Sequence, residues 1–154
     1  MSVVKYILLS DKVEGFVTYS FDKLGYLNSF RNCAWKITEK QVRWILEQIG
    51  YALTVNGFLQ WVRQHGYAVR KVEEDLSFER FYKEYGIARD KDRAEQIWKK
   101  IKTDEEKQYI FYNHEAYQRY CDRNKSWYNK MYLKTYLASH THDEWDKIET
   151  AVKK

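Results

Sequence analysis

Side chains that hold metals or activate nucleophiles are few in this chain, and their spacing does not favour a site. His140 and His142 lie two residues apart, with Asp143 beside them. A zinc site needs three or four converging ligands, and no further pair at metal-ligand spacing accompanies these residues. We therefore interpret them as polar residues around the start of a helix, and we expect no metal or other cofactor.

His114 and Cys121 are the pair that could combine a base with a nucleophile. They lie seven residues apart in a predicted helix, which separates them by about 10 Å at 1.5 Å rise per residue. That distance exceeds hydrogen-bond reach, and His114 shares a helical face with Ile110 and Tyr117, as a core or boundary histidine does. The six glycines are isolated, so the sequence holds no glycine-rich phosphate loop. The sequence therefore favours a protein that is not an enzyme.

A cluster of cations and aromatic rings is the strongest functional candidate. Five basic residues fall within a stretch of sixteen that holds one acid, Asp122, and two rings stand in its middle. We call this stretch the basic–aromatic strip, and its members are Arg119, Arg123, Lys125, Trp127, Tyr128, Lys130 and Lys134.

Three interpretations of the strip remain open from the sequence. Its cations could contact phosphates while Trp127 and Tyr128 stack on unpaired bases. The same residue types also dominate protein-binding hot spots, so a protein partner fits equally. In the third interpretation the rings belong to the core and the cations form a solvated rim.

Composition places the chain among folded proteins of one domain, or of two small modules that share a core. Its 154 residues suffice to bury a sizeable core without disulfides, and the absence of proline argues against long linkers. The net charge of +5 is too modest to prove a polyanion partner by itself. Cys33 and Cys121 match no zinc or disulfide framework, so we expect two reduced, buried thiols.

No segment has the length and apolar content of a membrane span or the pattern of a signal peptide. The apolar residues near the N-terminus are too few, and Asp11 and Glu14 follow them at once. We therefore expect a cytoplasmic protein with no membrane partner, whose oligomeric state the sequence leaves open.

The first 75 residues predict a three-stranded antiparallel meander with one or two helices. Alternating side chains mark strands over residues 3–10, 15–21 and 26–31, with a tight turn at Gly25. A capping box at Thr38 opens a helix that Gly50 ends, and a second helix runs from Thr54 or Asn56 to Gly66. Residues 67–72 could add a fourth strand.

Residues 76–154 predict a helical, aromatic-rich module of four or five helices. Ser77 and Gly86 bound the first helix, Asp90 or Asp92 opens the second, and Thr103 begins a long third helix that reaches about Arg123. A fourth helix is expected from Ser126 or Asn129 to Leu137. A capping box at Thr141 predicts a short last helix with Trp145, Ile148 and Val152 on one face. The fold class is thus α+β, with residues 1–75 and 76–154 packed as one unit.

The spacing of the aromatic residues in the helical part resembles a small module of phage and mobile-element proteins. That module also forms the C-terminal part of some phage replisome-organiser proteins. The residues that carry the resemblance are Phe78, Phe81, Tyr82, Tyr85, Ala94, Trp98, Lys100, Glu105, Glu106, Tyr136, Leu137 and Trp145. The N-terminal meander and helix are similar to small phage-type proteins of Bacteroidetes.

The resemblance and the strip together predict a non-enzymatic phage or mobile-element protein. It would bind nucleic acid or a nucleoprotein through the basic–aromatic strip. The alternative is a phage-encoded inhibitor of a host defence nuclease, similar to anti-CRISPR proteins, that acts by binding a host protein.

Overall fold

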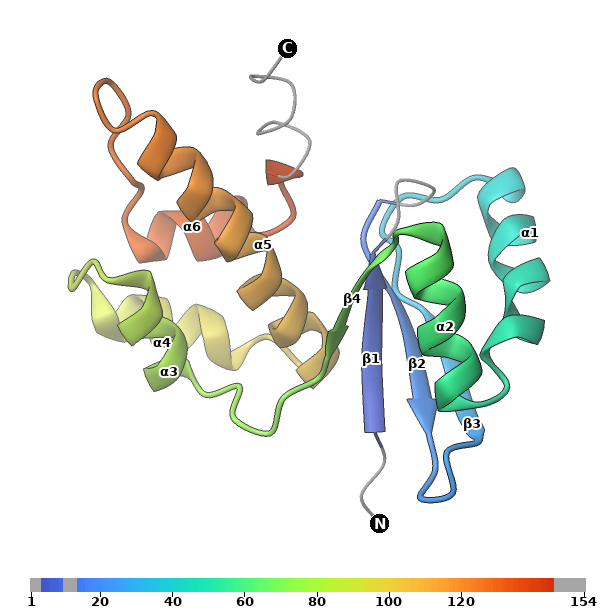
Figure 1. Ribbon diagram of the computed structural model, residues 1–154. Coiled ribbons are helices and arrows are strands. Elements are labelled where there is room, and N and C mark those ends of the chain that lie inside the picture. Colours follow the sequence, from blue (N-terminus) through green and yellow to red (C-terminus); the bar gives the residue numbers. More distant parts are fainter. Residues whose placement is uncertain (1–3, 10–13, 146–154) are drawn as a thin grey trace. The chain divides into compact units, whose positions relative to one another are not determined.

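The computed structural model describes residues 4–9 and 14–145 and has an α+β fold, as the sequence predicts (Figure 1). Contacts between Cα atoms divide the chain into an N-terminal unit, Met1–Val72, and a C-terminal unit, Glu73–Lys154. That the two parts pack as one unit stays a prediction.

The N-terminal unit is built on a four-stranded antiparallel sheet. Its strands are β1 (Val4–Leu9), β2 (Val17–Phe21), β3 (Leu27–Asn32) and β4 (Ala68–Lys71), in the order β3-β2-β1-β4. The predicted meander is confirmed, and the possible fourth strand pairs with β1, with Leu8 opposite Val69. In the turn between β2 and β3, Gly25 has a φ of +84°, and the Asp22 carboxylate accepts the N–H groups of Leu24 and Tyr26 at 2.9 Å.

Two helices cover one face of this sheet (Figure 1). Helix α1 (Glu39–Gln48) begins with the predicted capping box at Thr38, and it continues through Gly50 as a short 3₁₀ turn, η1 (Ile49–Ala52), before α2 (Val55–His65) starts at Thr54. Gly66 ends α2 with a φ of +65°. The core between the helices and the sheet is largely aromatic and includes Tyr19, Phe21, Phe58 and Trp61.

The C-terminal unit contains four helices within the described residues. They are α3 (Phe78–Tyr85), α4 (Lys91–Lys99), α5 (Asp104–Arg123) and α6 (Leu133–Ser139). Ser77 and Thr103 cap α3 and α5 as predicted, and Gly86 ends α3 with a φ of +84°. The predicted terminal helix with Ile148 and Val152 lies outside the described residues.

The start of α6 corrects one prediction. The sequence places it at Ser126 or Asn129, whereas the helix begins at Leu133. The Met131 N–H donates to the Tyr117 hydroxyl at 2.8 Å, and the Met131 carbonyl accepts from the Tyr85 hydroxyl at 2.6 Å. Because both backbone groups of Met131 are engaged by tyrosines, they are not available to a helix over these residues.

Stacked rings form the core of the C-terminal unit. The Phe81 ring lies 4.9 Å from that of Trp98 and 5.0 Å from that of Phe111, and the Tyr117 ring stacks on Tyr136 at 5.0 Å. Aromatic pairs at these distances contribute about 0.5–1.5 kcal/mol beyond the burial of their area. Most of the rings behind the family resemblance are therefore structural residues.

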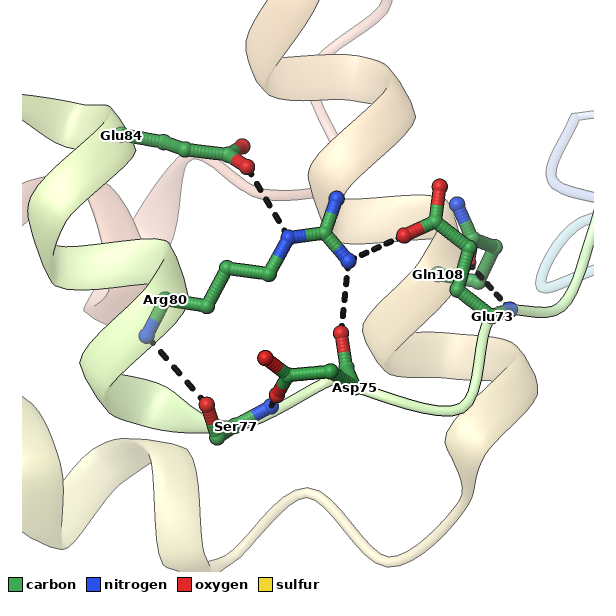
Figure 2. Close-up of polar contacts among 6 residues, drawn as sticks. All are labelled: Glu73, Asp75, Ser77, Arg80, Glu84 and Gln108. Atoms are coloured by element: carbon green, nitrogen blue, oxygen red, sulfur yellow. Dashed lines mark hydrogen bonds and ion pairs between the residues drawn. The ribbon is translucent and has the colours of Figure 1, made fainter.

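A cluster of polar contacts around Arg80 fastens the first residues of this unit to α3 (Figure 2). One guanidinium nitrogen, Nη1, donates to the Glu73 carboxylate and, at 2.6 Å, to the Asp75 carbonyl, and Nε donates to the Glu84 carboxylate at 3.0 Å. Partial burial works to lower the pKa of Arg80, but the two carboxylates outweigh it and raise that pKa. The guanidinium also lies 4.6 Å above the ring of Phe111 on α5.

We predict that Arg80→Met lowers the free energy of unfolding by about 1–2 kcal/mol, because it removes the three hydrogen bonds that one partly buried guanidinium makes. Arg43→Met is the control, since the Arg43–Glu39 pair is exposed on α1 and is worth about 0.5 kcal/mol or less. Urea denaturation followed by circular dichroism measures both variants. Equal losses in the two would show that the Arg80 cluster adds nothing beyond an ordinary surface ion pair.

Candidate functional site

The first two cations of the basic–aromatic strip lie near the C-terminal end of helix α5. Arg119 and Arg123 lie four residues apart, so they share one face of the helix, and both are exposed. Asn124 closes α5, with its N–H and its side-chain amide both donating to the Tyr120 carbonyl. Cations in the last turn of a helix also interact favourably with its negative end.

The loop of residues 124–132 follows α5 and projects beyond its end, drawn in orange in Figure 1. The N–H groups of Trp127 and Tyr128 both donate to the Asn124 carbonyl, at 3.0 and 2.8 Å, which fixes a tight turn. Lys125 is exposed, and Trp127 is 68% exposed. The loop therefore presents an indole ring to solvent directly after the two arginines.

Tyr128 has a different position from its neighbour Trp127. It is half-buried, its hydroxyl lies 3.2 Å from that of Tyr117, and its ring meets the Tyr120 ring edge-on at 5.1 Å. Tyr128 thus anchors the loop to α5, whereas the Trp127 side chain is exposed to solvent.

Lys130 is half-buried, and its ammonium is engaged by groups of the C-terminal unit. Its ammonium donates to the Tyr85 carbonyl at 2.8 Å, to His114 Nε2 at 3.0 Å and to the Gln118 side-chain carbonyl. It also sits 4.0 Å from the centre of the Tyr85 ring. These acceptors are all uncharged, so the cation is held by hydrogen bonds and a ring face rather than by a close carboxylate.

Burial sets the protonation of this cluster. It lowers the pKa of Lys130 to about 8, while the nearby Cys121 and Asp122 act in the opposite direction. Burial and the charge of Lys130 together lower the pKa of His114 to about 3. His114 is therefore neutral at physiological pH, and its Nε2 can accept a hydrogen bond from the Lys130 ammonium. Lys134, the last cation of the strip, is half-buried on α6.

Arg89 contacts Tyr132, the last residue of the loop, although the sequence gave no reason to select Arg89. It lies in the connection between α3 and α4, and its guanidinium is 4.6 Å above the ring of Tyr132. Its Nη1 donates to the Tyr132 hydroxyl at 2.7 Å. The two residues are 43 positions apart, so no local pattern could have paired them.

The histidines and cysteines are engaged in ordinary contacts. The His140 imidazole lies 2.6 Å from the Asp143 carboxylate three residues later, and His142 lies 3.8 Å from that of Glu106. Burial raises the pKa of the Cys121 thiol, which disfavours the reactive thiolate. Within residues 4–9 and 14–145, no three His, Cys, Asp or Glu side chains converge as metal ligands would. Both cysteines are free thiols, Cys121 buried and Cys33 half-buried.

None of the helices that the structure describes combines the length and apolar content that a membrane crossing requires.

Comparison with known proteins gives one similarity, and it covers less than half of the chain. Residues 73–140 match the model of the Legionella vir region protein LvrA C-terminal domain. The match begins at Glu73, the first residue of the C-terminal unit, and ends just after α6. No curated protein and no solved structure matches the chain.

The depressed pKa of Lys130 predicts how stability depends on pH. Between the folded value of about 8 and the ordinary 10.5, the unfolded chain binds a proton that the folded chain lacks. The free energy of unfolding should therefore rise with pH over this window, by at most about 1.4 kcal/mol per pH unit from this group.

The test compares the wild type with Lys130→Met in urea denaturation at several values between pH 7.5 and 9.5. The unfolding free energy of the wild type minus that of Lys130→Met should increase as pH rises. This difference isolates Lys130, because Cys121 and the tyrosines titrate in both proteins. Lys125→Met, at an exposed site, should show no such trend. A flat difference for Lys130→Met would place the ammonium in solvent, and a falling difference would mean that the fold raises its pKa; either result would contradict the prediction.

Proposed function

We propose that this chain is a mobile-element-associated binding protein, not an enzyme, that binds nucleic acid or a nucleoprotein. The binding surface is the exposed part of the basic–aromatic strip, formed by Arg119, Arg123, Lys125 and Trp127. The observation that carries the proposal is the 68% exposure of Trp127 on a loop beside exposed cations.

The chemistry of this surface suits a polyanion with accessible bases. Arginine and lysine neutralise phosphates and release the counterions that surround them. An exposed aromatic ring next to such cations can stack on a base, a contact worth about 1–3 kcal/mol. A single exposed tryptophan needs no special explanation by itself, so the argument rests on the ring and the cations lying together.

Lys130 and Lys134 have lesser parts in this proposal than in the sequence interpretation. The Lys130 ammonium is occupied inside the unit, so it positions the loop and does not contact phosphate. Lys134 is half-buried, and we assign it at most a peripheral contact. Tyr128 likewise supports the loop from within.

The family match supports the mobile-element association. The name of that family refers to the vir region of Legionella, and the match covers the strip and the helices that hold it. A phage origin and a relation to replisome-organiser proteins stay predictions from the aromatic pattern. The expected location in the cytoplasm also stays a prediction.

Charge reversal at the exposed cations tests the proposal. Arg123→Glu combined with Lys125→Glu should weaken binding of labelled DNA or RNA by tenfold or more at about 0.1 M salt, measured by fluorescence anisotropy. Binding by the wild type should also weaken steeply as salt rises, through counterion release.

Lys100→Glu with Lys102→Glu is the matched control. Both lysines are exposed and precede α5, and the helical rise from its first residue to Arg119, the first cation of the strip, is about 22 Å. This variant should bind nearly as well as the wild type. Absence of binding by the wild type to both single-stranded and duplex nucleic acid would refute the proposed function.

A second candidate function rests on the N-terminal unit, which exposes apolar side chains at one corner. Leu24 is 82% exposed, Tyr26 58%, and Tyr51 and Leu53 59% each. Backbone hydrogen bonds from Leu27 to Leu53 and from Val55 to Gly25 bring the two segments together. We call Leu24, Tyr26, Tyr51 and Leu53 the apolar corner.

Grouped exposed apolar side chains are typical of protein–protein contacts. The apolar corner therefore favours a protein partner, as the inhibitor of a host defence nuclease would require. Since the alternative acts by protein binding, it should survive removal of all nucleic acid.

We predict that Leu24→Asp with Leu53→Asp abolishes capture of a host protein from nuclease-treated lysate, because two charges in the contact oppose its desolvation. Lys40→Asp, at an exposed site at the start of α1, controls for added negative charge and should keep the partner. Loss of the partner in Arg123→Glu with Lys125→Glu instead would move the protein contact to the strip.

A further inference from the structure

We infer that the ligand of the strip is single-stranded nucleic acid, whose bases stack on Trp127 and on the Arg89–Tyr132 pair. The inference rests on the proposed function and narrows its substrate class. It also adds Arg89 and Tyr132 to the residues that hold the ligand.

Two connections of the C-terminal unit meet at this surface. Residues 86–90 join α3 to α4, and residues 124–132 join α5 to α6. The Tyr85 hydroxyl donates to the Met131 carbonyl at 2.6 Å, and the Lys130 ammonium donates to the Tyr85 carbonyl at 2.8 Å. These contacts hold the end of α3 against the second connection, so Arg89 lies close to the residues of the strip.

Arg89 and Tyr132 form a flat pair that remains open to solvent. The guanidinium carbon of Arg89 lies 4.6 Å from the centre of the Tyr132 ring. Arg89 is exposed, and Tyr132 is 46% exposed. The bond from Nη1 to the Tyr132 hydroxyl keeps the two groups in register. Planar guanidinium and aromatic groups are the surfaces on which proteins stack unpaired bases.

The backbone beside Arg89 is held in an uncommon conformation. Asp90 has a φ of +54°, in the left-handed region that residues other than glycine seldom adopt. The Arg89 N–H donates to the Ile87 carbonyl at 3.1 Å, which makes the turn tighter still. These two features define the backbone of the turn from which the Arg89 side chain extends.

Two separate rings at this surface favour an unpaired strand over a duplex. In a duplex the bases stack on one another, so a ring on the protein surface meets only their edges or the phosphates. Trp127 and Tyr132 lie five residues apart, which separates them by at most about 18 Å along the chain. Such a span fits within the 4–16 nucleotides that single-strand-binding modules commonly cover.

Exposed charges near the rings are mixed but favour a polyanion. Arg89, Arg123 and Lys125 supply cations, and Asp90 and Asp122 supply acids on the same segments. The Asp122 carboxylate accepts the Gln118 side-chain amide at 2.8 Å. Phosphates would therefore track the cations while the bases reach the two rings.

The test measures three labelled probes by fluorescence anisotropy: a 20-nucleotide mixed-sequence DNA strand, the same strand as RNA, and the 20-base-pair DNA duplex. At least one single strand should bind tenfold or more tightly than the duplex, and the difference between DNA and RNA identifies which strand is preferred. Trp127→Ala should weaken single-strand binding by about 5- to 100-fold and leave duplex binding within about twofold.

Arg89→Lys provides the second variant, because it keeps the charge and the exposed site but removes the planar group. It should weaken single-strand binding by about threefold or more without affecting the duplex, as should Tyr132→Leu if circular dichroism shows it folded. Lys125→Glu should weaken all probes alike. Duplex binding as tight as single-strand binding, or no effect of Trp127→Ala and Arg89→Lys, would overturn this inference and leave the proposed function standing. No binding of any probe would instead remove the proposed function and the inference with it.

Discussion

The half-buried ammonium of Lys130 is the interaction on which the candidate surface depends. Partial removal of a cation from water carries a cost, and hydrogen bonds with good geometry offset part of it. Here the acceptors are the last carbonyl of α3 and the side chains of His114 and Gln118 on α5, with the Tyr85 ring below. Since α3 and α5 supply the acceptors and the loop supplies the cation, movement of the loop would break all of these contacts at once. This constraint lets an exposed residue such as Trp127 keep a defined position.

Tyrosine hydroxyls also hold the loop of residues 124–132 in place through hydrogen bonds. Tyr85 and Tyr117 bind the two backbone groups of Met131, and Tyr117 also meets the hydroxyl of Tyr128. Burial raises the pKa of Tyr85 and of Tyr117, so both remain hydroxyls that can donate as well as accept. The aromatic content of the C-terminal unit therefore has two uses. Its rings fill the core, and its hydroxyls replace the backbone bonds of a segment that is not helical.

The sequence predicted those features that local rules control. Thr38, Ser77 and Thr103 begin helices because their hydroxyls accept backbone N–H groups three residues on, and Gly66 and Gly86 end helices because they adopt a positive φ. It could not predict that Lys130 turns inward or that Arg89 meets Tyr132, because these contacts join residues 12 to 45 positions apart. The predicted start of α6 at Ser126 or Asn129 was wrong for the same reason. Periodicity favoured a helix there, and long-range hydrogen bonds to Met131 prevailed.

The two units present surfaces of different chemistry, and this difference bears on what each can bind. In the proposed function the strip would attract its ligand mainly by charge, so its affinity should depend strongly on salt. A partner of the apolar corner would gain affinity from the burial of Leu24, Tyr26 and their neighbours, and burial of apolar area is not weakened by salt screening. The family match covers residues 73–140 and none of the apolar corner.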